Sequence, residues 1–100
     1  MQENNTWFEA NGDAILNSQA MLNYVPAFPF PGVIAEAGIF YESHRNENWD
    51  RLDNLVTVIS DPSQLDGVCG REVLLKVGHV ERTLAAGFQR LREYFDSLRA

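Results

Sequence analysis

A stripe of apolar residues in the last third of the chain constrains the fold more than any other feature of the sequence. The stripe recurs at steps of three and four residues and comprises Val73, Val77, Val80, Leu84, Phe88, Leu91, Phe95 and Leu98. At about 100° per residue these side chains fall within one narrow arc of a helix, and the arginines of the segment lie off that arc. The pattern predicts one long C-terminal amphipathic helix, with Gly78 and Gly87 as the places where it could bend.

This stripe needs an apolar partner surface, and two surfaces are possible. The stripe includes two phenylalanines and the rest of the chain needs a surface to pack on, so we expect the helix to pack against its own domain. The same spacing also fits a heptad for about three repeats, which is typical of helices that pair between molecules. A homodimer through the C-terminal helix is therefore the alternative.

Upstream of the stripe, proline and glycine residues separate segments that also have helical spacing. Thr6 and Glu9 have the spacing of a capping box, which predicts a helix from Thr6 to the residue before Pro26. Alternatively, Asn11, Gly12 and Asp13 break this segment into a short turn and a second helix. Pro31 suits the first position of the next helix, and residues 62–66 fit one short helical turn.

The middle of the chain is open to two interpretations. Helical spacing predicts two helices within residues 33–60, whereas Gly38–Tyr41 and Leu55–Ile59 have the β propensity of two strands. Because helical matches outnumber strict alternation, we predict an all-α fold, a compact domain of about four to five helices. The alternative is an α+β fold with a hairpin in residues 33–60.

Length and composition indicate one ordinary globular domain spanning residues 1–100. Hydrophobic residues make up 45% of the chain and charged residues 22%, which disfavours disorder. The single cysteine, Cys69, excludes an internal disulfide and the zinc sites that need paired cysteines. The N-terminus is polar and no apolar run approaches the ~20 residues of a membrane span. These features predict a cytoplasmic protein without a membrane partner.

Charge narrows the class of partner. The formal net charge is −6, and residues 1–68 carry ten acids but only two bases, whereas residues 69–100 carry six bases and four acids. An acidic chain repels phosphates, so direct binding of nucleic acid is disfavoured. A protein partner with a basic surface is favoured on the same grounds.

Motifs that carry catalysis or bind cofactors are not recognisable. His44 and His79 lie far apart, and Cys69, flanked by Gly67 and Gly70, is the single hint of a reactive nucleophile. We therefore predict no enzyme activity and no cofactor. The remaining catalytic alternative is a small metal-binding or hydrolytic enzyme that uses the cluster from Glu42 to Asp53.

Two features are typical of a binding surface. One is the acidic series in the middle of the chain, from which Glu42, Glu47, Asp50 and Asp53 are the predicted contact residues. The other is Phe28-Pro29-Phe30-Pro31, in which rigid prolines hold Phe28 and Phe30 as potential anchors.

In its size, its acidity and its lack of motifs, the chain resembles the phage-encoded anti-CRISPR proteins. The resemblance implies an inhibitor that acts in the host cytoplasm and blocks a CRISPR-Cas surveillance complex at a positively charged nucleic-acid surface. The predicted function is thus that of a small acidic inhibitor that docks on a basic nucleic-acid-handling protein. The alternative is a helical oligomerisation or adaptor module.

Overall fold

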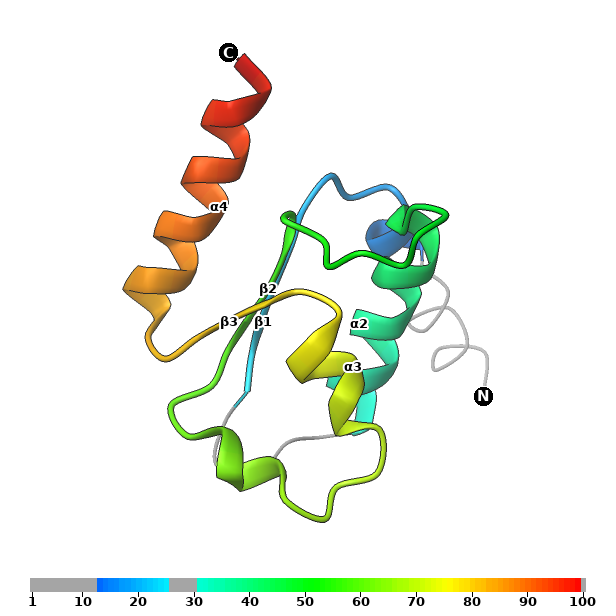
Figure 1. Cartoon of the computed structure of the whole chain (residues 1–100), viewed down its shortest axis with the longest axis vertical. Helices are drawn as coiled ribbons and strands as arrows, with labels where there is room; N and C mark the ends of the chain where they lie inside the picture. Colours follow the sequence, from blue (N-terminus) through cyan, green and yellow to red (C-terminus); the bar gives the residue numbers. More distant parts are fainter. Residues whose placement is uncertain (1–12, 26–30, 100) are drawn as a thin grey trace.

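Three parallel strands form the centre of the molecule, with helices on both sides of the sheet (Figure 1). The computed structural model describes residues 13–25 and 31–99. Its strands are β1 (Met21–Tyr24), β2 (Leu55–Val58) and β3 (His79–Glu81), in the spatial order β1-β2-β3. Its helices are α2 (Pro31–His44), the short 3₁₀ helix η1 (Pro62–Leu65), α3 (Arg71–Lys76) and α4 (Leu84–Arg99). Residues 13–16 are also helical and precede β1.

The connections between the strands place the helices in two layers. Parallel neighbours need a crossover connection, and α2 supplies the one from β1 to β2, while η1 and α3 supply the one from β2 to β3. Both α2 and α3 lie on one face of the sheet, and α4 lies on the other face (Figure 1). The C-terminal turns of α4 extend past the end of the sheet (Figure 1).

The core lies between the sheet and the layer formed by α2 and α3. All four residues of β2 are buried, and alternate side chains of this strand point to opposite faces. Leu55 and Ile59 join the core clusters on the α2 side. These clusters comprise Val25, Ala37, Ile59, Leu65 and Leu74, and Ile15, Phe40, Leu52 and Leu55.

The predicted all-α fold is wrong, because the segment 55–58 is a strand and residues 21–24 and 79–81 pair with it. A central strand that is buried on both faces is a continuous apolar run, which periodicity alone cannot tell from a buried helix. The alternative α+β class agrees with the structure. Its hairpin does not, because Gly38–Tyr41 lies within α2 and β2 pairs with its neighbours in parallel.

The predicted single C-terminal helix is also wrong, because β3 divides it into α3 and α4. Gly78 precedes β3, and a Cβ atom at this position would collide with the carbonyl oxygen of Leu55. The backbone of residues 78–81 therefore runs against β2, where Val80 packs on the core from a strand. Valines at positions 73, 77 and 80 match helical spacing although they come from α3, its C-cap and β3.

Several local predictions are confirmed. Pro31 begins α2, residues 62–65 form the short helical turn η1, and α4 is an amphipathic helix. The helix predicted to start at Thr6 begins outside the described residues, and its expected end is β1 instead. Among the described residues, none of the helices has both the length and the apolar character required to cross a bilayer.

Candidate interaction surface on helix α4

Helix α4 rests on the sheet through a glycine. Thr83 caps the helix, since its Oγ1 accepts a hydrogen bond from the Ala86 N–H at 3.1 Å. Within α4, all of whose residues are described, Gly87 is the one buried residue. A Cβ atom at Gly87 would lie 2.6 Å from Cγ2 of Val58, so the missing side chain lets the helix approach the sheet closely. The helix thus reaches the sheet by its backbone and contributes few apolar side chains to the core.

The apolar side chains of α4 lie on the same side of the helix as Gly87, but several of them remain exposed. Leu84, Phe88 and Leu98 keep 43%, 56% and 53% of their surface exposed, and Leu91 and Phe95 are half-buried. At 100° per residue, Phe88 lies about 100° from Gly87 around the helix axis, whereas Leu91 and Leu98 lie about 40° and 20° from it. The prediction that the whole stripe packs against its own domain is therefore wrong. We call Leu84, Phe88, Leu91, Phe95 and Leu98 the α4 stripe.

Tyr24 extends this apolar surface at the carboxyl end of the sheet. Its side chain is 58% exposed and lines a pocket of about 260 Å³ together with Leu84 and Val25. Arg82 also lines this pocket and donates a hydrogen bond to the carbonyl oxygen of Ser60 at 3.0 Å. Ligands of parallel sheets commonly bind at this edge. Here Arg82 already has an acceptor within the chain, and the pocket shares Leu84 with the α4 stripe.

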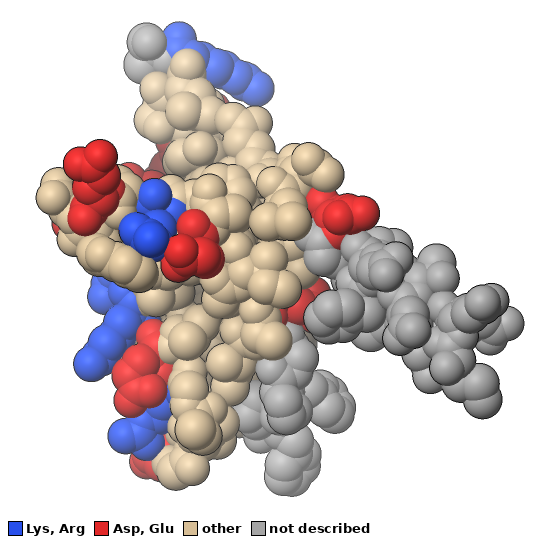
Figure 2. Space-filling model, turned by 90° about the vertical axis from the view of Figure 1, so that its right-hand side faces the viewer, with Lys and Arg blue, Asp and Glu red and all other residues tan. Residues whose placement is uncertain are grey.

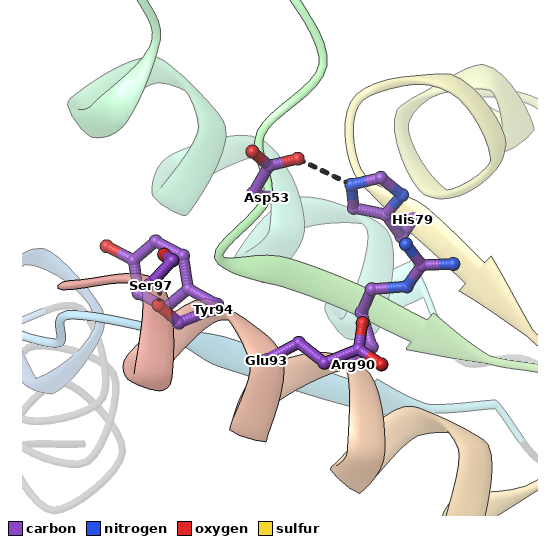
Figure 3. A pocket seen from close by; sticks show the side chains of 6 residues that line it. All are labelled: Asp53, His79, Arg90, Glu93, Tyr94 and Ser97. Carbon is purple, nitrogen blue, oxygen red and sulfur yellow. Dashed lines mark hydrogen bonds and ion pairs between the residues drawn. The ribbon is translucent and has the colours of Figure 1, made fainter. Parts of the chain in front are cut away.

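A polar pocket of about 250 Å³ lies on the opposite flank of α4 (Figure 3). It is lined by Asp53, His79, Arg90, Glu93, Tyr94 and Ser97. Nε2 of His79 lies 2.7 Å from Oδ1 of Asp53, and Figure 3 shows the guanidinium of Arg90 beside the imidazole ring. Arg90 in turn binds Glu81 at 2.9 Å, which fixes α4 to β3.

This pocket holds a histidine–carboxylate pair, and among the described residues no hydroxyl group forms a hydrogen bond with either member of it. The hydroxyl of Ser97 donates to the carbonyl oxygen of Tyr94 at 2.6 Å, within the helix. The side chain of Asp53 is 76% exposed, so water competes for its contact with His79. Nucleophilic catalysis needs the nucleophile within hydrogen-bond reach of its base. We therefore interpret the pair as a tie between β3 and the loop that precedes β2.

Two of the four acids predicted to contact a partner already have a partner within the chain. Glu42, at the end of α2, accepts two hydrogen bonds from Arg45 at 3.0 and 3.1 Å, and these bonds lower the pKa of Glu42. Asp53 contacts His79, while Glu47 and Asp50 are exposed in the loop between α2 and β2. Figure 2 shows acidic and basic side chains next to one another on the side that carries α2. Phe28 and Phe30 lie outside the described residues.

Sequence reasoning missed the most informative position of this surface. Gly87 was expected to bend a helix, whereas the structure uses it as the point of contact with β2. A glycine beside an apolar stripe is the signal that could have indicated a close approach of two backbones. The pairing of Asp53 with His79 had no such signal, because 26 residues separate the two.

The assignment of function has to rest on the surface of the described residues, because neither a cluster of metal ligands among them nor a similar known protein is found. Within residues 13–25 and 31–99, no three His, Cys, Asp or Glu side chains lie together as metal ligands would. Cys69 is exposed and precedes α3, whose N-cap is Gly70. Comparisons of the chain with protein-family models, curated proteins and solved structures found no match.

Proposed function

We propose that the chain is a protein-binding module that associates with a second copy of itself through the α4 stripe. The observation that supports this function is that Leu84, Phe88 and Leu98 are about half exposed along one face of a single helix. Heptad spacing of apolar residues on an exposed helix face is typical of helices that pair. This is the oligomerisation alternative that the sequence pattern left open.

Electrostatics around α4 is compatible with self-association. The molecule as a whole has a net charge of −6, which makes two copies repel. The α4 sequence, in contrast, contains the bases Arg90, Arg92 and Arg99 and the acids Glu93 and Asp96. Two α4 helices therefore bring nearly balanced charge to the proposed contact.

Sedimentation equilibrium over a concentration series tests this function. The wild-type chain is expected to shift from monomer to dimer, whereas Phe88→Ser is expected to weaken the dimer by roughly 10-fold or more, because it removes one buried aromatic side chain per copy. Leu16→Ser is the matched control, since Leu16 is 53% exposed outside the α4 stripe. A wild-type chain that stays monomeric, or a Phe88→Ser dimer as stable as the wild type, would contradict the proposal.

A second candidate is the acidic inhibitor that docks on a basic nucleic-acid-handling protein, with the anti-CRISPR proteins as its model. The observation in its favour is that Glu47 and Asp50 are exposed and, among the described residues, form no ion pair with a base. The test is binding to a purified CRISPR-Cas surveillance complex at low salt. The double variant Glu47→Lys, Asp50→Lys is expected to lose binding. If the wild-type chain does not bind the complex, or if the double variant binds as tightly as the wild type, this candidate is removed.

A further inference from the structure

The loops that follow β2 and β3 diverge to opposite faces of the sheet. The chain leaves β2 toward η1 and α3, on the face that α2 covers, and it leaves β3 toward α4 on the other face (Figure 1). In open parallel sheets, such a divergence between neighbouring strands opens a crevice at their carboxyl ends, and small ligands commonly bind there. The topology therefore marks the space between these two loops as the place where this fold would hold a ligand.

The pocket of about 260 Å³ beside Tyr24 lies at this point. Ser60 and Gln64 line it from the segment after β2, while Arg82 and Thr83 line it from the segment after β3. Its volume is below the roughly 300–1,000 Å³ of sites that hold drug-sized molecules, which favours a small ligand.

Arg82 gives the pocket its charge, since it is the single charged residue among the described residues that line it. The bond from its Nη1 to the carbonyl oxygen of Ser60 holds the guanidinium across the crevice. A guanidinium has five N–H donors, so others remain for a ligand, and its planar fork fits phosphate. Asp61 lies near Arg82, but the pKa of Asp61 is lowered mainly by its bond with Ser63 and only in small part by the charge of Arg82. The N-terminus of α4 adds a weaker preference for an anion at the same end of the sheet.

Gln64 contributes an acceptor that has no donor. Its Oε1 is buried, and among the described residues it has no hydrogen-bond partner. A buried acceptor without a donor carries a desolvation cost, and native proteins satisfy most such groups with water or another partner. A hydroxyl group of a ligand that donates to Oε1 would remove this cost.

We propose that this pocket binds a small phosphate monoester that also carries a hydroxyl group. Arg82 contacts the phosphate, the hydroxyl donates to Oε1 of Gln64, and the ring of Tyr24 closes one side. The net charge of −6 opposes the entry of an anion, so the two contacts together give a dissociation constant on the order of millimolar. The pocket lies within one copy, so this inference does not depend on self-association.

Titration of the isotope-labelled full chain with glycerol phosphate, followed by NMR, tests the site. The backbone signals of Ser60, Gln64, Thr83 and Leu84 are expected to shift and saturate with one dissociation constant. Inorganic phosphate and glycerol each supply one half of the ligand, and both are expected to bind roughly 10-fold more weakly or less tightly still. No saturable shift of these signals with glycerol phosphate would overturn the inference, as would inorganic phosphate binding equally well.

Two variants test the role of the charge. Arg82→Gln is expected to weaken the binding of glycerol phosphate by roughly 10-fold, because a charge-assisted hydrogen bond is lost, and Arg82→Lys is expected to restore part of it. Arg51→Gln is the matched control, since it makes the same change of charge at an exposed position before β2. Equal effects of Arg82→Gln and Arg51→Gln would show that only the overall charge matters and would overturn the site.

Gln64→Met tests the unpaired acceptor. The substitution keeps the length of the side chain and removes the buried oxygen, so the melting temperature is expected to stay the same or rise. Binding of glycerol phosphate is expected to fall to the strength of inorganic phosphate, whereas the binding of inorganic phosphate itself stays unchanged. A Gln64→Met chain that is folded and binds glycerol phosphate as tightly as the wild type would contradict the assigned role of Gln64.

Discussion

The two faces of the sheet are built in opposite ways. On one face, α2 and α3 supply side chains that are wholly covered, such as Phe40 and Leu74, which keep 0% and 1% of their surface exposed. On the other face, α4 supplies a glycine and leaves Phe88 56% exposed. Parallel sheets are normally covered on both faces. The chain thus completes one core by itself and leaves apolar side chains of α4 exposed on the other side of the sheet.

Truncation of one phenylalanine on each face gives the largest predicted contrast. Phe40→Ala is expected to lower the free energy of unfolding by about 3–5 kcal/mol, because it leaves a cavity in a closed core. Phe88→Ala is expected to cost about 0.5 kcal/mol or less in the monomer, because its ring is already half exposed. Urea denaturation at a concentration below dimer formation measures both. Equal losses for the two variants would mean that the faces are not different.

Replacing one helical glycine on each side of the sheet with alanine gives the next largest contrast in stability. Gly87→Ala is expected to cost about 1–3 kcal/mol, because its Cβ would lie 2.6 Å from Val58 and force α4 off the sheet. Gly38→Ala is the matched control on α2, since its Cβ would meet Val73 at an ordinary 3.9 Å. There the gain in helix propensity is expected to stabilise by about 0.5–1 kcal/mol. Thermal unfolding of both variants would contradict the account if Gly87→Ala were as stable as Gly38→Ala.

Salt separates the two candidate functions by the sign of a smaller effect. Self-association through α4 is expected to strengthen a few-fold between about 50 mM and 500 mM NaCl, because salt screens repulsion between like-charged copies. Docking of Glu47 and Asp50 on a basic partner would weaken over the same range. Sedimentation of the chain alone measures the first trend. A dimer that dissociates as salt rises would indicate that ion pairs, and not the α4 stripe, hold it together.

The smallest predicted effect concerns Asp61, which lies on neither face. Its carboxylate accepts a hydrogen bond from the Ser63 N–H at 3.0 Å, which lowers the pKa of Asp61 below the ordinary value of 3.8. A lowered pKa in the folded state stabilises the fold above the ordinary pKa, and this contribution is lost as the pH falls through the folded value. Titration of the Asp61 carboxyl by NMR is expected to give a midpoint below 3.8, and a midpoint above it would contradict the cap.

The sequence predicts α2 and the strand β2 better than it predicts how α4 packs on the sheet. Pro31 and the apolar residues of α2 indicate a helix, and the β-branched residues of Leu55–Ile59 were recognisable as a possible strand. What periodicity could not supply was how little of the α4 stripe the rest of the chain covers. Nor could it supply the close approach of Gly87 to Val58, which lies far from it in the sequence. Periodicity likewise does not show that Asp53 contacts His79, which lies far from it in the sequence.

Chemical shifts recorded by NMR over a dilution series test the central claim most directly. The account predicts that the signals of Leu84, Phe88 and Leu98 change with protein concentration, while those of the buried residues Phe40 and Leu74 stay constant. The curves are expected to share one dissociation constant on the order of micromolar. Signals of the α4 stripe that do not change at any concentration, or changes confined to the loop of Glu47 and Asp50, would contradict the claim that α4 is the interface between two copies.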